Sequence, residues 1–255
     1  MRISSKLWSY ICIASIALFL FLAIRSDALP HVQGRMATLP RITLWAWERR
    51  EDLRGINAPR YAIAYLDQTI TISNTVDAQV RRNTLAIPAS AKRIPVVRIE
   101  AARTARLDAR NHADTVAAIL RSAAEPGVAA LQIDFDAPAS QRAFYRALLK
   151  DVRQQMQADL PLSITALASW CSWDNWIHDL PVDEAIPMMF RMEPDHRLAP
   201  PRADDFVIRE PLCRGSYGIS TTEPWPSNLD GKQLYIFADH GWRTDTPDAI
   251  LRRLR

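Results

Sequence analysis

The chain has 255 residues, a formal net charge of +4 and 48% hydrophobic residues. This length is enough for one large globular domain or two small ones. The arginines are scattered among acidic residues and form no dense basic run with interleaved aromatic residues, so the composition does not favour a nucleic-acid-binding protein.

The N-terminus begins with basic residues and continues as a hydrophobic run. Arg2 and Lys6 precede an apolar segment from Leu7 to Ile24. This pattern is typical of a secretory signal peptide or of a membrane anchor, and the sequence leaves both alternatives open for residues 1–30. The basic end favours the cytoplasmic side, which predicts that the rest of the chain lies in the periplasm or on the outer face of the inner membrane. Abundant arginine and alanine with little lysine is typical of a GC-rich bacterial genome.

Residues 31–39 are polar and irregular, and we interpret them as a linker. Beyond the linker, short runs rich in β-branched and aromatic residues predict strands. The segment 69–87 predicts extra strands or an irregular excursion. The predicted strands cover residues 41–47, 61–66, 94–99, 129–135, 162–168, 185–190, 216–220 and 234–238.

Helices are predicted between several of these strands, where apolar residues recur at helical spacing. Ser140 is the expected cap of one of them, and Thr246 followed by Pro247 is the expected start of the last. The predicted helices cover residues 111–124, 140–156, 201–212 and a short segment after 246.

Strands that alternate with a few helices predict a parallel barrel. The fold class is therefore α/β, a (β/α)₈ TIM-type barrel with reduced or missing helices over residues 40–255, preceded by one N-terminal hydrophobic helix. An open α/β sheet is the alternative, but no Gly-rich phosphate loop follows an early strand.

The fourth predicted strand ends in two acidic residues. Asp134 and Asp136 lie two residues apart, so they share one face of the strand. Burying carboxylates costs free energy, and barrel enzymes place their active-site residues at the C-terminal ends of strands. The two residues therefore favour a functional site, and the alternative is a structural pair that forms salt bridges with Arg98 or Arg191.

The other strand ends are expected at the same mouth and carry residues suited to a sugar site. Paired carboxyl groups can divide into a protonated acid and an ionised partner, with Asp136 as the acid or the group that orients it and Asp134 as its electrostatic partner. Glu48, Glu100 and Asp239 are the alternative sources of the catalytic acid. Aromatic rings can stack on sugar rings, although tryptophans in these positions also serve as packing. The expected substrate-binding residues are Trp45, Trp47, Arg98, Trp170, Arg191, Asp239 and Trp242.

Four stretches of the chain resemble a bacterial family of uncharacterised exported proteins with a glycosidase-like barrel. They are Leu44-Trp45-Ala46-Trp47-Glu48-Arg49 and residues 131–137, 162–171 and 181–192. The resemblance implies the barrel fold and assigns no activity.

The fourth strand is also distantly similar to family-18 chitinases, which carry the signature Asp-x-x-Asp-x-Asp-x-Glu. Asp134 and Asp136 match the two middle acids, whereas Leu131 stands at the first acid and Pro138 at the glutamate that is the family's proton donor. The resemblance implies a glycoside-hydrolase-like protein acting on an envelope or extracellular polysaccharide. The missing glutamate keeps a non-catalytic carbohydrate-binding or envelope-assembly barrel as the alternative.

The sequence predicts an oligosaccharide or polysaccharide as the partner and no cofactor. Asp134, Asp136, Asp239 and His240 include metal-ligating types, but no His-x-x-x-His or Cys-x-x-Cys spacing occurs, so no metal is expected.

Cys171 and Cys213 lie in the part of the chain expected to be exported. They can form a disulfide if the Cys213 segment passes over the top of the barrel. They cannot do so if Cys213 lies at the bottom, because a disulfide requires Cα atoms within about 7 Å. Both arrangements stay open.

Overall fold

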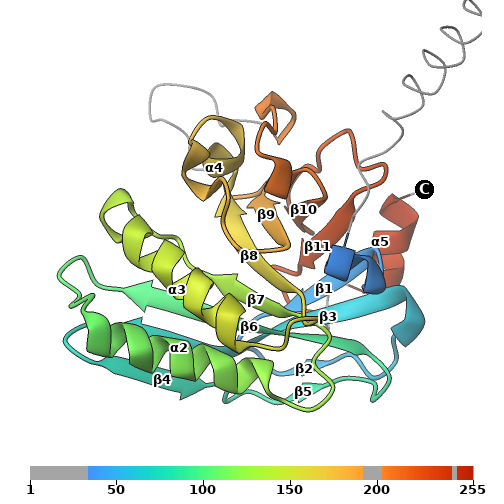
Figure 1. The fold of residues 1–255 in the computed structure, drawn as a ribbon. Helices are drawn as coiled ribbons and strands as arrows, with labels where there is room; N and C mark the ends of the chain where they lie inside the picture. The colour runs from blue at the N-terminus through green and yellow to red at the C-terminus, as the bar shows by residue number, and fades with distance from the viewer. Residues whose placement is uncertain (1–33, 192–202, 243–245, 255) are drawn as a thin grey trace, which may run out of the picture. The chain divides into compact units, whose positions relative to one another are not determined.

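Eight parallel strands close into a barrel in the computed structural model (Figure 1). Each strand pairs with the next, and the last pairs with the first through residues 42–45 and 234–237. This closure confirms the predicted TIM-type barrel, and each of the predicted runs corresponds to one strand. In order around the barrel, the strands are β1 (Ile42–Ala46), β3 (Tyr61–Ile72), β6 (Lys92–Ala101), β7 (Leu131–Asp134), β8 (Leu162–Leu167), β9 (Glu184–Met188), β10 (Ser216–Ser220) and β11 (Gln233–Phe237).

The structure describes residues 34–191, 203–242 and 246–254. The predicted signal peptide or anchor, with its hydrophobic helix, lies outside these residues. No helix in the described ranges is both long enough and apolar enough to cross a bilayer.

The excursion predicted over residues 69–87 consists of extra strands. β4 (Val76–Val80) pairs antiparallel with the end of β3, and β2 (Glu51–Asp52) pairs with β5 (Leu85–Ala86) in a separate small sheet. A register shift between Leu66 and Gln68 marks a bulge in β3. The bulge changes which face the following side chains occupy. Gln68 donates a hydrogen bond to the Ala118 carbonyl oxygen (2.9 Å) in helix α2 (Ala109–Ala123).

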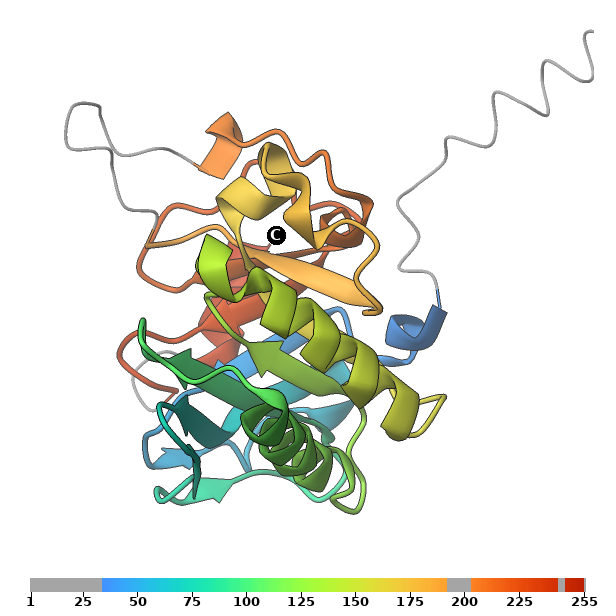
Figure 2. The ribbon, with the colours of Figure 1, turned by 60° about the vertical axis from the view of Figure 1, so that its left-hand side comes forward.

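Few helices cover the barrel, as predicted. Figure 2 shows the two longest crossing one side of it. Asp108 caps the first by accepting a hydrogen bond from the Asn111 amide (3.0 Å), whereas Ser140 does not cap the second, because it lies inside the 3₁₀ turn η4 (Ala139–Gln141) that precedes it. Thr246 stands at the N-cap position of the last helix, as expected. The helices are α2 (Ala109–Ala123), α3 (Arg142–Gln155), α4 (Ala168–Ser172) and α5 (Pro247–Arg253).

The helix predicted over residues 201–212 is wrong. The described part of this segment contains only the short turns η6 (Ala203–Asp205) and η7 (Pro211–Cys213). Between them, the Arg209 and Glu210 amides donate to the Cys171 carbonyl oxygen at 2.8 and 3.1 Å. Because these donors bind a neighbouring segment, they are not available for intrahelical hydrogen bonds.

Residues 31–39 were predicted to be a linker, but from residue 34 onward they pack as part of the barrel domain. The 3₁₀ turn η2 (Gly34–Thr38) and Leu39 bring Met36 and Leu39 into the apolar cluster inside the barrel, where Met36 is 1% exposed. Arg35 anchors the turn by donating to Asp183 (2.7 Å). An apolar barrel interior needs such a cover, because otherwise water would reach its open end.

Cys171 and Cys213 form a disulfide, with their Cα atoms 5.8 Å apart. Helix α4 follows β8 directly and packs near β9, and η7 packs against β9 as well. The two cysteines therefore meet in the layer outside the barrel, where both are buried in the same apolar cluster. A long helix after β8 would have separated them, so the shortened crossover makes the bridge possible.

Candidate functional site

The barrel interior changes from apolar to polar toward the C-terminal ends of the strands. Below the mouth, Trp45 is 2% exposed and donates from Nε1 to Gln132 Oε1 (2.8 Å). Gln132 in turn donates to Ser163 Oγ (3.3 Å). Trp45 was predicted to bind substrate, but its edge is held inside the barrel, so only the residues above it are open to a ligand.

Asp134 is the buried anchor of the mouth. Its Oδ2 accepts a hydrogen bond from Arg98 Nη1 (2.7 Å), and its Oδ1 accepts one from Thr165 Oγ1 (2.7 Å). Arg98 also donates from Nε to Glu100 (2.9 Å). Three predicted site residues, Arg98, Glu100 and Asp134, therefore form one ion-pair network. The salt-bridge partner of Asp134 is Arg98, one of the two arginines considered from the sequence.

Asp136 lies beside this network but has no partner of its own. It follows the end of β7, its side chain is exposed, and no hydrogen bond to it forms within the described ranges. Partial desolvation in the mouth and the neighbouring Asp134 carboxylate raise the pKa of Asp136, while Arg98 opposes them. Arg98 already pairs with two other carboxylates, so desolvation and the Asp134 charge outweigh its effect and the pKa of Asp136 is raised.

An aromatic column lines the mouth next to the acids. Trp47 stacks on Trp45 with ring centroids 4.8 Å apart, and Trp45 stacks on Phe237 at 4.7 Å. Phe190 packs against Phe237 at 4.8 Å. Trp47 is half-buried, and the Arg98 guanidinium lies 5.4 Å from its ring centroid. The column therefore ends in an accessible ring directly beside Arg98 and Asp134.

Phe190 and Phe237 are missing from the sequence prediction. Phe237 shares a strand face with Tyr235, which points inside the barrel, so the alternation along β11 could have indicated it. Phe190 follows the end of β9, and no periodic signal marked it.

Glu48 holds a loop and is not free in the mouth. Its Oε1 accepts hydrogen bonds from the backbone amides of Arg82 (3.1 Å) and Asn83 (2.8 Å) and from the Asn83 side chain (2.8 Å). Desolvation alone would raise the pKa of Glu48, but these hydrogen bonds outweigh it and lower the pKa. A carboxylate so bound stays ionised and is a poor general acid.

Asp239 forms a second polar group at the ends of β10 and β11. It accepts hydrogen bonds from Arg191 (2.7 Å), from Thr222 (2.8 Å) and from Ser220. Desolvation raises its pKa, but the hydrogen bonds outweigh this effect and lower the pKa of Asp239. The predicted residues Arg191 and Asp239 thus pair with each other, and Arg191 takes no part in binding Asp134.

Two predicted substrate-binding tryptophans lie away from the mouth. Trp170 is 2% exposed and packs edge-on against Trp176, in the cluster between the helices and the outer face of the sheet. Trp242 is 4% exposed and donates from Nε1 to the Trp45 carbonyl oxygen (3.0 Å), on the outer side of β1. Both residues contribute to the packing around the barrel.

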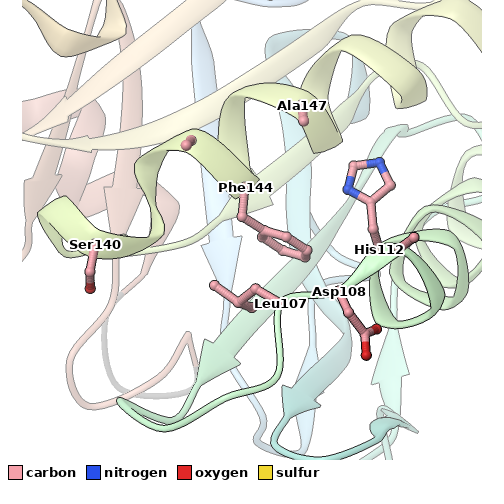
Figure 3. A pocket seen from close by; sticks show the side chains of 8 residues that line it. Leu107, Asp108, His112, Ser140, Phe144 and Ala147 are labelled. Carbon is pink, nitrogen blue, oxygen red and sulfur yellow. The ribbon is translucent and has the colours of Figure 1, made fainter.

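A separate groove of about 470 Å³ lies between the first turns of α2 and α3 (Figure 3). Phe144 forms its wall, and His112 packs its ring edge against Phe144 while pairing with Asp151 (2.8 Å). None of the predicted site residues lines this groove. Across the described ranges, no group of three or more histidine, cysteine, aspartate or glutamate residues is arranged to hold a metal ion.

Residues 90–185 match the model of a family described as Domain of unknown function (DUF3142). This span includes β6, β7 and β8, and hence Arg98, Asp134 and Asp136. It confirms the resemblance to a family without an assigned activity. No curated protein matches the chain.

Among solved structures, the chain is similar to the chitinase domain of the spore coat protein CotE from Clostridium difficile. The TM-score is 0.42 and the sequence identity is 13%, over 60% of this chain and 50% of that chain. The chain thus spans about half the length of the chitinase structure that it matches.

Proposed function

We propose that the protein is a glycosidase-like barrel that acts on an envelope or extracellular polysaccharide through the mouth lined by Trp47, Asp134 and Asp136. The observation that carries the proposal is the unpartnered Asp136 carboxyl group beside the partly buried Arg98–Asp134 ion pair. Two neighbouring carboxyl groups in unlike environments are the usual means by which one fold supplies both a protonated acid and an ionised partner.

In this proposal Asp136 donates a proton to the glycosidic oxygen as the bond to the leaving sugar breaks. A water molecule adds to the anomeric carbon and releases its proton to solvent, from which Asp136 is protonated again. Arg98 and Thr165 hold both oxygens of Asp134 in place by hydrogen bonds. The Asp134 charge contributes to the raised pKa of Asp136 and stabilises positive charge that develops on the sugar ring. Trp47 is half-buried, and the accessible part of its ring offers a stacking surface for a sugar ring.

A non-catalytic carbohydrate-binding barrel is the second candidate, and a specific observation favours it. The other carboxylates around the mouth are engaged, with Glu48 bound to a loop, Glu100 to Arg98 and Asp239 to Arg191. Pro138 also stands where the related chitinase signature has its proton donor. A barrel mouth that keeps its aromatic column would then bind glycans without cleaving them.

We further propose that the domain works outside the inner membrane of a bacterium. The basic and hydrophobic N-terminal pattern supports export, either with a cleaved signal or with an anchor. The buried Cys171–Cys213 disulfide also supports an oxidising compartment such as the periplasm.

The test uses the full chain in mild detergent, as wild type and as Asp136→Asn. Both are incubated with end-labelled oligosaccharides, and cleavage and binding are followed in the same samples. The catalytic proposal predicts cleavage by the wild type and a loss of about 10²- to 10⁴-fold in the variant, because the proton donor is gone.

Asp77→Asn is the matched control, since Asp77 is an exposed acid on β4 that contacts Gln79. It should cleave like the wild type. Saturable binding that survives Asp136→Asn, without cleavage by any form, would support the binding protein instead. Absence of both binding and cleavage across the panel would reject both candidates.

A further inference from the structure

A buried phenol lies behind the candidate acid without a hydrogen-bond partner. Tyr145, on α3, is fully buried, and its Oη makes no hydrogen bond within the described residues. Its ring packs edge-on against Phe135, with centroids 5.0 Å apart. Phe135 stands between Asp134 and Asp136 in the chain, so the tyrosine packs against the segment that carries both acids.

An unpaired buried hydroxyl group is costly, so a partner for Tyr145 is expected. Both Asp134 and Asp136 act electrostatically on the phenol and, together with burial, raise the pKa of Tyr145. Asp134 already accepts hydrogen bonds from Arg98 and Thr165 on its two oxygens. Asp136 accepts none in the described part of the chain, and it is exposed.

We propose that Tyr145 is a positioning residue for Asp136, and that its phenol O–H donates a hydrogen bond to one oxygen of the Asp136 carboxyl group. This bond places the second oxygen toward the mouth, where it carries the proton. The hydrogen bond is inferred from the buried, unpartnered phenol and its ring contact with Phe135, whereas its effect on catalysis rests on the proposed function.

The proposed hydrogen bond predicts the direction in which the pKa of Asp136 changes when the phenol is removed. A phenol donor stabilises the ionised carboxylate more than the neutral acid. Tyr145→Phe removes only the hydroxyl group, so it should raise the pKa of Asp136 above its wild-type value. The measurement is a ¹³C NMR titration of the full chain in detergent with labelled aspartate carboxyl groups, in which Asp136→Asn identifies the signal.

Tyr235→Phe is the matched control. Tyr235 is also fully buried, but it donates to Glu184 inside the barrel (3.0 Å). Removal of the Tyr235 hydroxyl group should leave the Asp136 titration unchanged. An unchanged Asp136 pKa in Tyr145→Phe, with native secondary structure, would overturn the proposal.

A second measurement needs no folded variant. In the wild type, labelled at tyrosine Cζ, the Tyr145 signal should shift as Asp136 ionises, and the absence of that inflection would also overturn the hydrogen bond. If the protein cleaves glycans, Tyr145→Phe should lower kcat by about tenfold to a hundredfold while KM changes little. An upward pKa shift without any glycan cleavage by the wild type would keep the hydrogen bond and reject the proposed function.

Discussion

At the scale of single residues, the chemistry of the mouth depends on how one arginine is shared. Arg98 pairs with Asp134 and Glu100 and leaves Asp136 without a direct counter-ion. Sequence alternation placed both aspartates on one face of the strand, but it could not show which of them the arginine would bind. That choice depends on β6 lying beside β7 with Arg98 opposite Asp134.

A second buried acid lies lower in the barrel, away from the mouth. Glu184 is 3% exposed and accepts a hydrogen bond from Tyr235 (3.0 Å). Burial raises the pKa of Glu184 from 4.5 to about 7, against the hydrogen bond from Tyr235. The adjacent Asp183 adds to the increase, and Asp183 itself pairs with Arg35 and Arg153.

This pKa predicts a pH-dependent stability. The folded chain retains a proton on Glu184 that the unfolded chain loses, so the free energy of unfolding decreases as the pH rises from about 4.5 through about 7. The decrease in the free energy of unfolding that comes from Glu184 is roughly 3 kcal/mol. Glu184→Gln cannot ionise and should be more stable than the wild type at pH 8, with a smaller difference at pH 5.

Urea denaturation of the full chain at both pH values measures this difference. Glu100→Gln is the control, because Glu100 is largely exposed at the mouth and should leave the pH dependence of Glu184 in place. A Glu184→Gln variant that loses stability between pH 5 and pH 8 as steeply as the wild type would show that Glu184 does not titrate in this range.

At the scale of elements, two features close and tie the barrel without appearing in the sequence pattern. The turn η2 covers the end of the barrel where the strands begin, although its short polar sequence is typical of a linker. The disulfide joins α4 to η7 because the β8–β9 crossover is short. Both depend on contacts between distant parts of the chain, which local periodicity does not report.

The cover at η2 should contribute measurably to stability. Met36→Ala removes a side chain that is 1% exposed, and should cost about 2–4 kcal/mol of the free energy of unfolding. Thr38→Ala, an exposed position on the same turn, should cost less than about 0.5 kcal/mol. Urea denaturation compares the two, and equal effects would mean that the turn does not seal the barrel.

The disulfide gives a separate prediction. Cys171 and Cys213 are separated by 42 residues, and a cross-link over such a loop is worth about 4 kcal/mol in the chain-entropy model. The double Cys171→Ala, Cys213→Ala variant should therefore melt at a lower temperature than the wild type in the absence of reductant. Identical melting curves would indicate that the bridge does not form in the protein.

At the scale of the whole molecule, the barrel could be predicted because each strand is a distinct apolar run between polar segments. Residues 131–136 are the clearest case, since apolar and polar side chains alternate up to the two acids. The position of each tryptophan could not be predicted in the same way. Trp47 reaches the mouth while Trp170 and Trp242 pack outside, because the path of each loop decides where a residue beyond the strand end points.

The proposed function depends on Asp136 as a proton donor in the mouth of this barrel. Its most direct test is the pH dependence of glycan cleavage by the full chain. We expect cleavage that is fastest while Asp136 is protonated, that decreases as the pH rises through its raised pKa, and that is lost in Asp136→Asn. A rate that stays constant or rises over this range, or an Asp136→Asn variant as fast as the wild type, would contradict it.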